Sequence, residues 1–381
     1  MSSQSFADLG ISRPIVDALL KQGMSEPFAI QRLVIPDVLA GRDVLAKSPT
    51  GSGKTLAFAA PLIDRIDAQA RRPAALVLAP TRELAVQIVE QSRPLAQARA
   101  LSIAAVYGGV GIERQAKQAR RAHVLVATPG RLLDLLGRGA ITLEHVRALV
   151  LDEADRMLDM GFKPDVDRIV SRVSSDRQTL FFSATLDGEV GRLAGAYTRS
   201  ARRHEHAPPR SEARVEHRFV GVVPQGKVDA VVGELRRGDA GRTLVFVRTK
   251  HGADRLAKRL AKHGIQAAAI HGNKSQSQRT KALAGFESGA TATLVATDVA
   301  ARGIDVDGVA RVINFDPPHD HQAYVHRVGR TARAGRGGVG VTLVLDDQVA
   351  DVARIARSLD LRHEFAAAGF HGGRDHRRRR R

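Results

Sequence analysis

The stretch that decides the fold is Ser48-Pro49-Thr50-Gly51-Ser52-Gly53-Lys54-Thr55. Before it, residues 43–46 are apolar enough for a short buried strand, and after it Leu56 to Arg65 has the pattern of a helix with one early proline. A strand, a glycine-rich loop and a helix in this order are typical of a phosphate-binding loop. The alternative, a glycine-rich turn that binds nothing, is disfavoured by the strand and helix on either side.

Residue types in this loop suit a nucleoside triphosphate. Two glycines let backbone N–H groups close around phosphate oxygens, and the start of the following helix adds the positive end of its dipole. Lys54 is placed to reach the β- and γ-phosphates, and Thr55 to bind magnesium. Ser48 replaces the usual first glycine with another small residue. The predicted nucleotide contacts of the loop are Thr50, Gly51, Ser52, Gly53, Lys54 and Thr55.

Composition limits the class of partner. The 381 residues suffice for about two domains of ordinary size. Fifty-nine Lys and Arg against 40 Asp and Glu give a formal charge of +19, which favours a polyanion, with nucleic acid ahead of a membrane surface. The absence of cysteine excludes disulfides, thiolate zinc sites and cysteine nucleophiles. Without a long apolar run or a secretory pattern at residues 1–10, we expect a cytoplasmic protein that does not enter a membrane.

Short apolar runs alternate with polar loops and helical stretches along both halves of the chain. This alternation predicts an α/β fold with mostly parallel sheets covered by helices on both faces. In such sheets the functional loops gather at the carboxyl ends of the strands. The runs are Ala74–Ala79, Val124–Ala127, Ala148–Leu151, Thr179–Phe182, Thr243–Val247, Ala267–Ile270, Thr293–Ala296, Val309–Phe315 and Gly340–Leu345.

The two halves share a similar segment, Leu125 to Thr128 and Leu294 to Thr297, as if one unit had been used twice. Between them, Thr198 to Arg214 has charges, histidines and Pro208-Pro209 but no apolar period, which indicates a linker. We therefore predict an ATP-binding domain over 1–200, a linker over 201–213, a second domain over 214–360 and a basic, disordered tail over 361–381. The arginines at 374 and 377–381 form either a nonspecific RNA tether or a solvated tail without function.

The N-terminal segment from Phe6 to Gln31 predicts two short amphipathic helices, with a start signal at residues 12–14 and a stop at Gly23. Gln31 stands upstream of the phosphate loop. Its amide offers the donors and the acceptor that reading an adenine edge requires. Taken alone, a glutamine at this position is more often a solvated helix residue.

The acidic string Asp152-Glu153-Ala154-Asp155 follows the predicted strand Ala148–Leu151. A phosphate-loop NTPase needs one carboxylate for magnesium and another to position or deprotonate water. An acidic tetrapeptide alone is more often a solvated helix start, but its place after a buried strand predicts a site. Ser183 and Thr185 follow another strand, and their hydroxyls either hydrogen-bond the acidic loop or cap a helix.

Arginines recur near the end of the second half. Arg330 and Arg333 stand three residues apart in Tyr324 to Arg333, which predicts one face of a helix. A guanidinium fork matches phosphate geometry, so both side chains suit the γ-phosphate of a nucleotide held by the first domain. In that case hydrolysis requires the domains to close. A solvated basic helix and a direct nucleic-acid contact are the alternatives.

In this order the motifs resemble those of DEAD-box RNA helicases of superfamily 2, over almost everything from Phe6 to about Leu345. The acidic string and His326 to Arg333 are the most specific parts, and the short architecture is similar to bacterial RhlE-type members. The resemblance implies two tandem RecA-like domains, ATP and Mg²⁺ as cofactors, and ATP hydrolysis on RNA binding. It also implies local separation of RNA duplexes or remodelling of RNA–protein complexes. A DNA helicase and an ATP-gated RNA clamp or scaffold are the rival functions.

Partners also follow from the resemblance. RNA is expected as a single strand or short duplex, with ribosomal or RNA-degradation proteins as candidate protein partners and a monomer as the working form. Since only 4% of residues are aromatic and tryptophan is absent, stacking platforms that read bases are few. We therefore expect contacts to the RNA backbone and little sequence specificity.

The resemblance also assigns roles to single residues of this chain. Gln31 matches the adenine-reading glutamine, Asp152 the magnesium-side carboxylate and Glu153 the hydrolytic base, beside the triphosphate contact Lys54. Four residues match the set that couples hydrolysis to unwinding, namely Asp155, Ser183, Thr185 and His326. In the second half, Gly303 and Asp305 match nucleotide contacts, and Arg330 and Arg333 match the arginine fingers.

Further matches concern RNA. The implied contacts to the RNA backbone are Arg82, Gly109, Thr128 and Arg131 in the first half and Gln276, Arg279 and Thr297 in the second. One position departs from the family pattern, because Met24 follows Gly23 where the family usually carries an aromatic residue. That departure predicts weaker adenine stacking.

Overall fold

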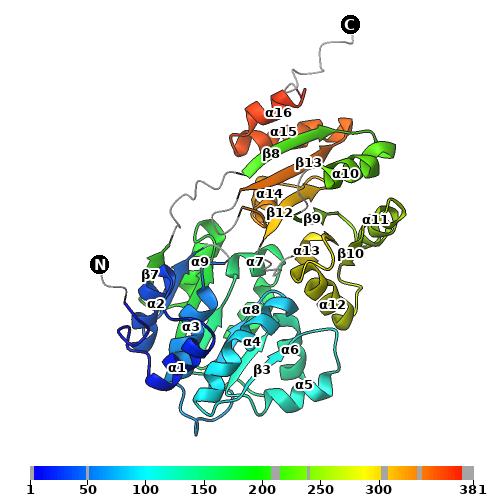
Figure 1. The fold of residues 1–381 in the computed structure, drawn as a ribbon. Coiled ribbons are helices and arrows are strands. Elements are labelled where there is room, and N and C mark those ends of the chain that lie inside the picture. Colours follow the sequence, from blue (N-terminus) through cyan, green and yellow to red (C-terminus); the bar gives the residue numbers. More distant parts are fainter. Residues whose placement is uncertain are drawn as a thin grey trace. The chain divides into compact units, whose positions relative to one another are not determined.

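The computed structural model describes residues 4–48, 51–206, 215–237, 241–301, 308–332 and 337–370. The chain divides into two compact units, Met1–Pro208 and Pro209–Arg381 (Figure 1). We call them the first and second units.

The first unit is built on a parallel sheet of seven strands among the described residues, in the order β3-β4-β2-β5-β6-β1-β7. The strands are β1 Val44–Lys47, β2 Ala75–Leu78, β3 Ile103–Val106, β4 Val124–Ala127, β5 Ala148–Leu151, β6 Gln178–Ser183 and β7 Arg202–Glu205. The helices are α1 Arg13–Lys21, α2 Ala29–Leu39, α3 Lys54–Arg65, α4 Arg82–Ala98, α5 Ile112–Ala119, α6 Pro129–Gly137, α7 Ala154–Asp159, α8 Lys163–Val170 and α9 Gly188–Tyr197.

Alternating side chains of the central strands fill two cores, one on each face of this sheet. Val77 and Val150 pack with helices α1 to α4 on one face, while Leu76 and Leu149 pack with α5 to α9 on the other. Because both faces are covered, the central strands are apolar along their whole length rather than at every second residue.

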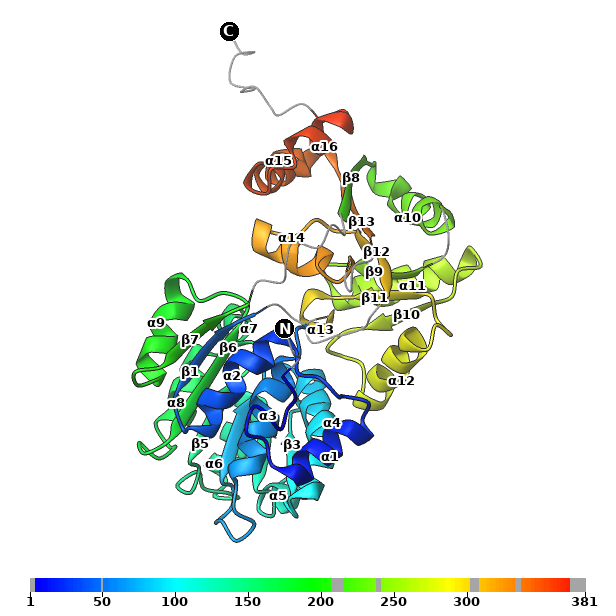
Figure 2. The same ribbon diagram turned by 60° about the vertical axis from the view of Figure 1, so that its left-hand side comes forward.

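The second unit has a parallel sheet of six strands over the described residues, in the order β10-β11-β9-β12-β13-β8. Its strands are β8 Val215–Gly221, β9 Arg242–Phe246, β10 Ala267–Ile270, β11 Thr293–Ala296, β12 Val309–Asn314 and β13 Gly338–Val344. Its helical elements are η1 Pro224–Gly226, α10 Lys227–Arg236, α11 Lys250–Lys262, α12 Gln276–Glu287, α13 Asp298–Ala301, α14 His321–Val328, η2 Asp346–Gln348, α15 Val349–Ser358 and α16 Arg362–Ala367. Figure 2 shows α15 and α16 beside β8, where Phe365 packs against Phe219.

The fold class predicted from the apolar runs is confirmed, since every one of those runs coincides with a strand to within two residues. The two sheets also share one order. If strands are numbered within each unit, the second sheet repeats the first without a counterpart of β7. This repetition agrees with the similar segments that end β4 and β11.

Several expectations were wrong. Strands β3, β7 and β8 were not predicted, and β7 lies inside the expected linker, where it pairs with β1. The basic tail was expected from residue 361, but α16 occupies 362–367 and buries Phe365. The second N-terminal helix continues past Gln31 to Leu39. The rest of the linker at 207–214 and the arginines of 371–381 lie outside the described residues.

No helix in the described part of the chain is long and apolar enough to cross a membrane.

Candidate nucleotide and RNA site

The phosphate loop follows β1 and leads directly into α3. Gly51 and Gly53 both have left-handed backbones, with φ of 79° and 84°, which favour glycine. A Cβ on Gly53 would lie 2.5 Å from the ring of Phe28, so this position also lacks space for a side chain. Lys54 is buried, and its Nζ donates to the carbonyl oxygen of Ser48 over 2.9 Å. This bond joins the first residue of α3 to the residue that follows β1.

Other loop residues complete this picture in part. The hydroxyl of Ser48 donates to that of Ser52 over 2.6 Å, which ties the two ends of the loop together. Thr55 is half-buried in the first turn of α3. Thr50 lies outside the described residues.

Gln31 contacts the phosphate loop instead of solvent. Its side chain is 2% exposed, its Nε2 donates to the carbonyl oxygen of Gly53 over 3.0 Å, and its Oε1 accepts from the N–H of Phe28 over 2.8 Å. The solvated-helix interpretation is therefore wrong. Phe28 itself is 60% exposed beside the same loop, a feature that the sequence pattern did not single out. Met24, in contrast, packs against the core.

The acidic string ends β5 and begins α7, with all three carboxylates buried. Asp152, Glu153 and Asp155 are 2%, 5% and 7% exposed, which rules out a solvated helix start. Glu153 adopts a left-handed backbone, φ 52°, which is uncommon outside glycine and turns the chain sharply between the strand and the helix. Burial raises the pKa of Asp152 to about 6, and the neighbouring carboxylates add to this effect while Lys54 opposes it.

This environment fits a divalent cation. A buried carboxylate whose pKa is raised by burial and by adjacent acids would be stabilised in its charged form by an added positive charge. Among the described residues, no group of three or more His, Cys, Asp or Glu side chains is arranged to hold a metal alone. Magnesium commonly uses one or two protein ligands together with substrate phosphates and water, so a magnesium site does not require a larger cluster of side chains.

Arg156 is a site residue that the sequence analysis missed. Its guanidinium forms a buried ion pair with the Glu153 carboxylate at 2.5 Å, one turn along α7. The signal was present, because an arginine three residues after an acid on a helix faces that acid. The ion pair positions the carboxylate that the resemblance assigns as the hydrolytic base.

The acidic loop contacts the end of β6 through a backbone group. Asp155 Oδ2 accepts from the N–H of Ala184 over 3.1 Å, and the Ser183 hydroxyl accepts from the N–H of Thr185 over 3.3 Å. The hydroxyls of Ser183 and Thr185 were expected either to bond the acidic loop or to cap a helix. No such bond is found among the described residues, and the next helix, α9, has Asp187 at its N-cap. The loop and strand are connected nonetheless, through Ala184.

Residues implied to bind RNA gather at one edge of the first sheet, since β3, β4 and β2 are neighbours. The Arg82 guanidinium packs against Gly109, where an added Cβ would lie 2.1 Å from Nη1 of the arginine. Arg131 donates to Gln115 Oε1 over 2.6 Å and to the carbonyl of Val110. Thr128 precedes α6, and its backbone N–H donates to the carbonyl oxygen of Val106. The expected contacts are thus brought together at the carboxyl ends of three adjacent strands.

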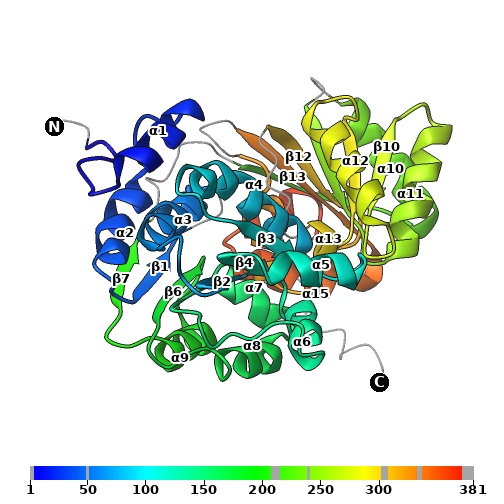
Figure 3. The ribbon, with the colours of Figure 1, turned by 90° about the horizontal axis from the view of Figure 1, so that it is seen from below.

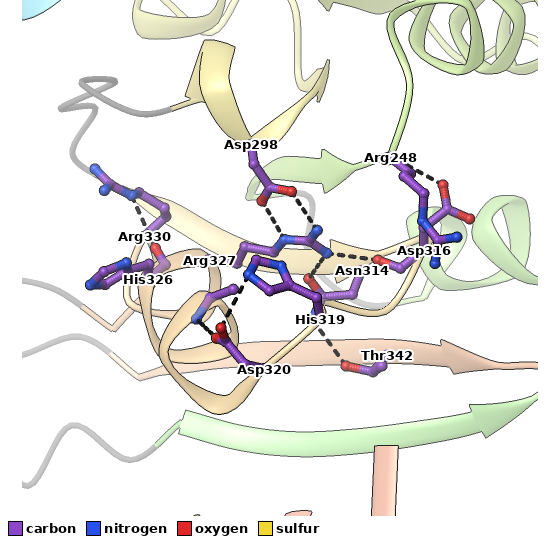
Figure 4. Close-up of polar contacts among 11 residues, drawn as sticks. Arg248, Asp298, Asn314, Asp316, His319, Asp320, His326, Arg327, Arg330 and Thr342 are labelled. Atoms are coloured by element: carbon purple, nitrogen blue, oxygen red, sulfur yellow. Dashed lines mark hydrogen bonds and ion pairs between the residues drawn. The ribbon is translucent and has the colours of Figure 1, made fainter. Parts of the chain in front are cut away.

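The second unit contains a buried arginine network that was also missed (Figure 4). Arg327 is 4% exposed and donates to both carboxylate oxygens of Asp298, at 2.6 and 2.7 Å. It also donates to Asn314 Oδ1 and to the carbonyl oxygen of Asp316. This network fixes α14 against the ends of β11 and β12, and so positions the residues that follow the helix.

Arg330 does not lie on the predicted helix face, because α14 ends at Val328 with Gly329 as its C-cap. Its side chain is 6% exposed, and its Nε donates to the carbonyl oxygen of His326 over 3.3 Å. Figure 4 shows this bond between Arg330 and the last turn of the helix. Arg333, Gly303 and Asp305 lie outside the described residues.

The expected RNA contacts of the second unit also meet at a sheet edge. Gln276 and Arg279 lie on the first turns of α12, and Thr297 directly follows β11. Arg279 donates to the carbonyl oxygen of His271, which follows β10, the neighbour of β11. Gln276 Oε1 is buried without a hydrogen-bond partner among the described residues.

Comparisons with known proteins identify the family of the chain. A family model described as DEAD/DEAH box helicase matches residues 28–193, and one described as Helicase conserved C-terminal domain matches residues 226–335.

Two curated relatives are each named DEAD-box ATP-dependent RNA helicase CshA. The protein of Geobacillus kaustophilus is 40% identical over 356 residues, which cover 93% of this chain and 76% of that protein. The protein of Bacillus subtilis is 40% identical over 345 residues, which cover 89% and 69%. Among solved structures, S. cerevisiae Dbp5 bound to RNA and ADP BeF3 superposes with a TM-score of 0.81 at 29% identity, covering 94% of each chain.

Proposed function

The chain belongs to the DEAD-box family of ATP-dependent RNA helicases, and from that membership we propose how its own residues bind ATP, hydrolyse it and hold RNA. The observation that carries the proposal is a group of buried polar side chains in the first unit. There Lys54 and Gln31 converge on the phosphate loop, and three buried carboxylates lie at the end of β5.

The phosphate loop binds the triphosphate. On ATP binding, Lys54 exchanges the carbonyl of Ser48 for the β- and γ-phosphates, since a charged phosphate oxygen is the stronger acceptor. Gln31 exchanges its bond to Gly53 for the adenine edge. Both side chains are already oriented by these bonds, so little conformational entropy is lost when they bind the nucleotide.

Thr55 and Asp152 hold Mg²⁺, which supplies charge neutralisation at the transferring phosphoryl group. Glu153 receives the proton of the attacking water, and Arg156 positions its carboxylate for that role. Removing the carboxylate charge while keeping the shape, as in Glu153→Gln, should therefore stop hydrolysis but not binding.

Asp155 transmits the state of the acidic loop to the end of β6 through Ala184. We propose that Ser183, Thr185 and His326 belong to the same coupling between hydrolysis and unwinding. Arg330 and Arg333 complete the site from the second unit, which requires closure of the two units on ATP and RNA. Gly303 and Asp305 contribute nucleotide contacts from that unit.

The RNA backbone is held by the two sheet-edge clusters, Arg82, Gly109, Thr128 and Arg131 in the first unit and Gln276, Arg279 and Thr297 in the second. Guanidinium, amide, hydroxyl and backbone groups recognise phosphates and 2′-hydroxyls rather than bases, so the RNA specificity is for the backbone. We propose that the protein works as a monomer in the cytoplasm. Ribosomal or RNA-degradation proteins are the class of protein partner that we propose.

The test compares Lys54→Ala and Glu153→Gln with the wild type in ATPase, RNA-binding and duplex-unwinding assays. We expect both variants to lose turnover, Lys54→Ala through weaker ATP binding and Glu153→Gln with ATP and RNA retained. RNA should stimulate the wild-type ATPase and DNA should not. Wild-type hydrolysis by Glu153→Gln would overturn the base assignment, and RNA-stimulated hydrolysis without strand separation would favour the clamp.

Closure is tested separately with fluorophores on the two units. ATP and RNA should each tighten the binding of the other by the same factor, as linkage requires. Arg330→Ala should leave ATP binding largely intact and remove hydrolysis, since a finger acts mainly on charge that develops in the transition state. A fluorophore separation that is identical with and without ATP and RNA would refute this mechanism.

A further inference from the structure

Helix α11 carries a stripe of basic side chains on its outer face. The stripe consists of His251, Arg255, Lys258, Arg259 and Lys262, all of them exposed. At about 100° per residue these positions share one side of the helix. The apolar residues Ala253, Leu256 and Leu260 occupy the opposite side and are buried in the core.

The charges of this stripe are not balanced by acids on the same helix. The one acidic residue of α11, Asp254, is paired with His271 and Lys274, at 3.0 and 2.8 Å. Arg236 of α10 adds a further cation at the C-terminal end, where it donates to the carbonyl oxygen of His263. In Figure 3, α11 lies beside α10 and β10 in the second unit.

The spacing of the stripe costs the free protein some stability. Arg255 with Arg259, and Lys258 with Lys262, are like charges four residues apart, a spacing that destabilises a helix. A helix whose outer face only met solvent would be more stable with acids at alternate positions. A polyanion lying along α11 would relieve this repulsion at every pair.

The stripe begins next to the RNA contacts proposed for the second unit. Lys250, at the start of α11, donates to Asn273 Oδ1 over 3.0 Å, and Asn273 lies in the loop that leads to Gln276. Because α11 connects the carboxyl end of β9 with the start of the parallel strand β10, it runs from that loop toward the amino ends of the strands. From His251 to Lys262 it extends roughly 16 Å, at about 1.5 Å per residue.

We propose that the outer face of α11 is a second RNA-binding surface. It holds the phosphates of an RNA that extends beyond the sheet-edge contacts. The stripe contains no Phe, Tyr or Trp, so it binds the backbone without reading bases. It lengthens the RNA that one molecule engages and leaves the chemistry of ATP hydrolysis unchanged. RNA is favoured over an anionic membrane because the stripe continues from RNA contacts and because α11 has no exposed large apolar side chain beside its charges.

The experiment removes four charges from the stripe in the full chain, as Arg255→Gln, Lys258→Gln, Arg259→Gln and Lys262→Gln combined. Glutamine has nearly the helix propensity of lysine and arginine, so α11 should still form. The matched control removes four exposed charges elsewhere, as Arg13→Gln, Lys21→Gln, Arg354→Gln and Arg357→Gln combined. Both variants have the same net charge.

Affinity is measured over a range of KCl concentrations for oligouridylates of 10 and 40 nucleotides. For the longer RNA, the slope of log affinity against log salt should flatten by about 3 in the stripe variant, at roughly 0.7 per phosphate contact for four contacts. The shorter RNA, which fills only the sheet-edge contacts, should bind as before. The control variant should bind both RNAs as the wild type does, and RNA-saturated ATPase rates should agree among all three proteins.

Three results would overturn the proposal. An equal loss in the control variant would show a general effect of charge, and an equal loss for the shorter RNA would place α11 within the principal contacts. Loss of binding to vesicles containing phosphatidylserine, with unchanged RNA slopes, would assign the stripe to a membrane. If the fourfold variant melts at a lower temperature than the wild type, the double variant Lys258→Gln with Lys262→Gln replaces it. Half the change in the salt slope is then expected for the longer RNA.

Discussion

The two units have the same order of strands, but they differ in how a lysine and an aspartate at corresponding places of the fold interact. In the first, a glycine-rich loop follows β1, Lys54 begins the next helix and Asp152 follows β5. In the second, β8 occupies the place of β1, Lys227 begins α10, and Asp316 lies two residues after β12. A lysine and an aspartate thus recur at equivalent places in both sheets.

What differs is whether the two charges meet. Lys227 Nζ lies 2.7 Å from Asp316 Oδ1 and 4.1 Å from the centre of the Phe315 ring, so its charge is compensated within the unit. Lys54 donates to a backbone carbonyl instead, and the pKa of Asp152 is raised to about 6 by its burial. The shared fold puts a lysine and an aspartate at corresponding places in both units. We infer that the loop after the first strand determines whether the two side chains pair with each other or remain available to a ligand.

The largest expected effect separates these two lysines. Lys54→Ala should lower RNA-stimulated kcat/KM for ATP at least about 100-fold, because a cation on the transferring phosphates is lost. It should cost little stability, since the bond lost is to a backbone carbonyl. Lys227→Ala should do the reverse and leave kcat near the wild-type value. It should lower the free energy of unfolding by about 2 kcal/mol, less than a fully buried pair because Asp316 is partly exposed.

Steady-state ATPase assays and urea unfolding of both variants check this prediction. Loss of turnover in a folded Lys227→Ala protein would contradict this prediction, because it would show that Lys227 also takes part in catalysis.

A smaller effect concerns Asp155, whose carboxylate connects the acidic loop to Ala184. Asp155→Ala should lower the number of duplexes separated per ATP about tenfold, since the N–H of Ala184 loses its acceptor and β6 no longer follows the acidic loop. ATP binding should change little. Unwinding and ATPase rates measured on the same RNA give this ratio, and an unchanged ratio would remove Asp155 from the coupling.

Phe28 should have a weaker effect, limited to nucleotide affinity. Its ring is exposed beside Gly53 and Gln31, in the segment where Met24 replaces the usual aromatic residue. If the ring packs on the nucleotide, Phe28→Ala should raise the KM for ATP about fivefold, an aromatic contact of roughly 1 kcal/mol. Phe28→Tyr is the matched control and should retain the wild-type KM. An unchanged KM in Phe28→Ala would show that the ring contributes nothing to binding.

The smallest effect is a pH dependence in the second unit. Burial lowers the pKa of His217, whose Nδ1 lies 2.8 Å from the Tyr324 hydroxyl, while nearby Glu364 opposes that shift. A lowered histidine pKa means that the unfolded chain binds the proton more tightly. Stability is therefore fully present above about pH 6.5 and is lost as the pH falls below it.

Urea midpoints at pH 7.5 and 5.5 measure this loss. The difference between the two should shrink in His217→Gln and stay unchanged in His251→Gln, which alters an exposed histidine. Equal differences in both variants would contradict the assignment.

The sequence predicts the central strands and the nucleotide loop well because both depend on local patterns. A strand buried on both faces must be apolar throughout, as Val124–Ala127 is, and a phosphate loop needs glycines at fixed spacing. Edge strands obey no such rule. Residues Arg202–Glu205 are all polar or charged, and strand β8 has exposed positions at Glu216 and Gly221, so neither carries the signal of a buried strand.

Site residues that depend on contacts distant in sequence were not predictable in the same way. The partners of Arg327 are Asp298 and Asn314, 29 and 13 residues away, so only the packing of α14 reveals that it is buried. Gln31 was ambiguous for the same reason, since its partner Gly53 lies 22 residues further on. Motif recognition supplied the roles, and the fold supplied the contacts.

Strand β7 has a practical consequence for dissecting this protein. Arg202 N–H donates to the carbonyl of Asp43, and His206 N–H to that of Lys47, so β7 covers the edge of β1, the strand that leads into the phosphate loop. An expression fragment that stopped at residue 200 would leave that edge open to strand exchange and aggregation. A fragment intended to isolate the ATP-binding half should therefore extend through His206.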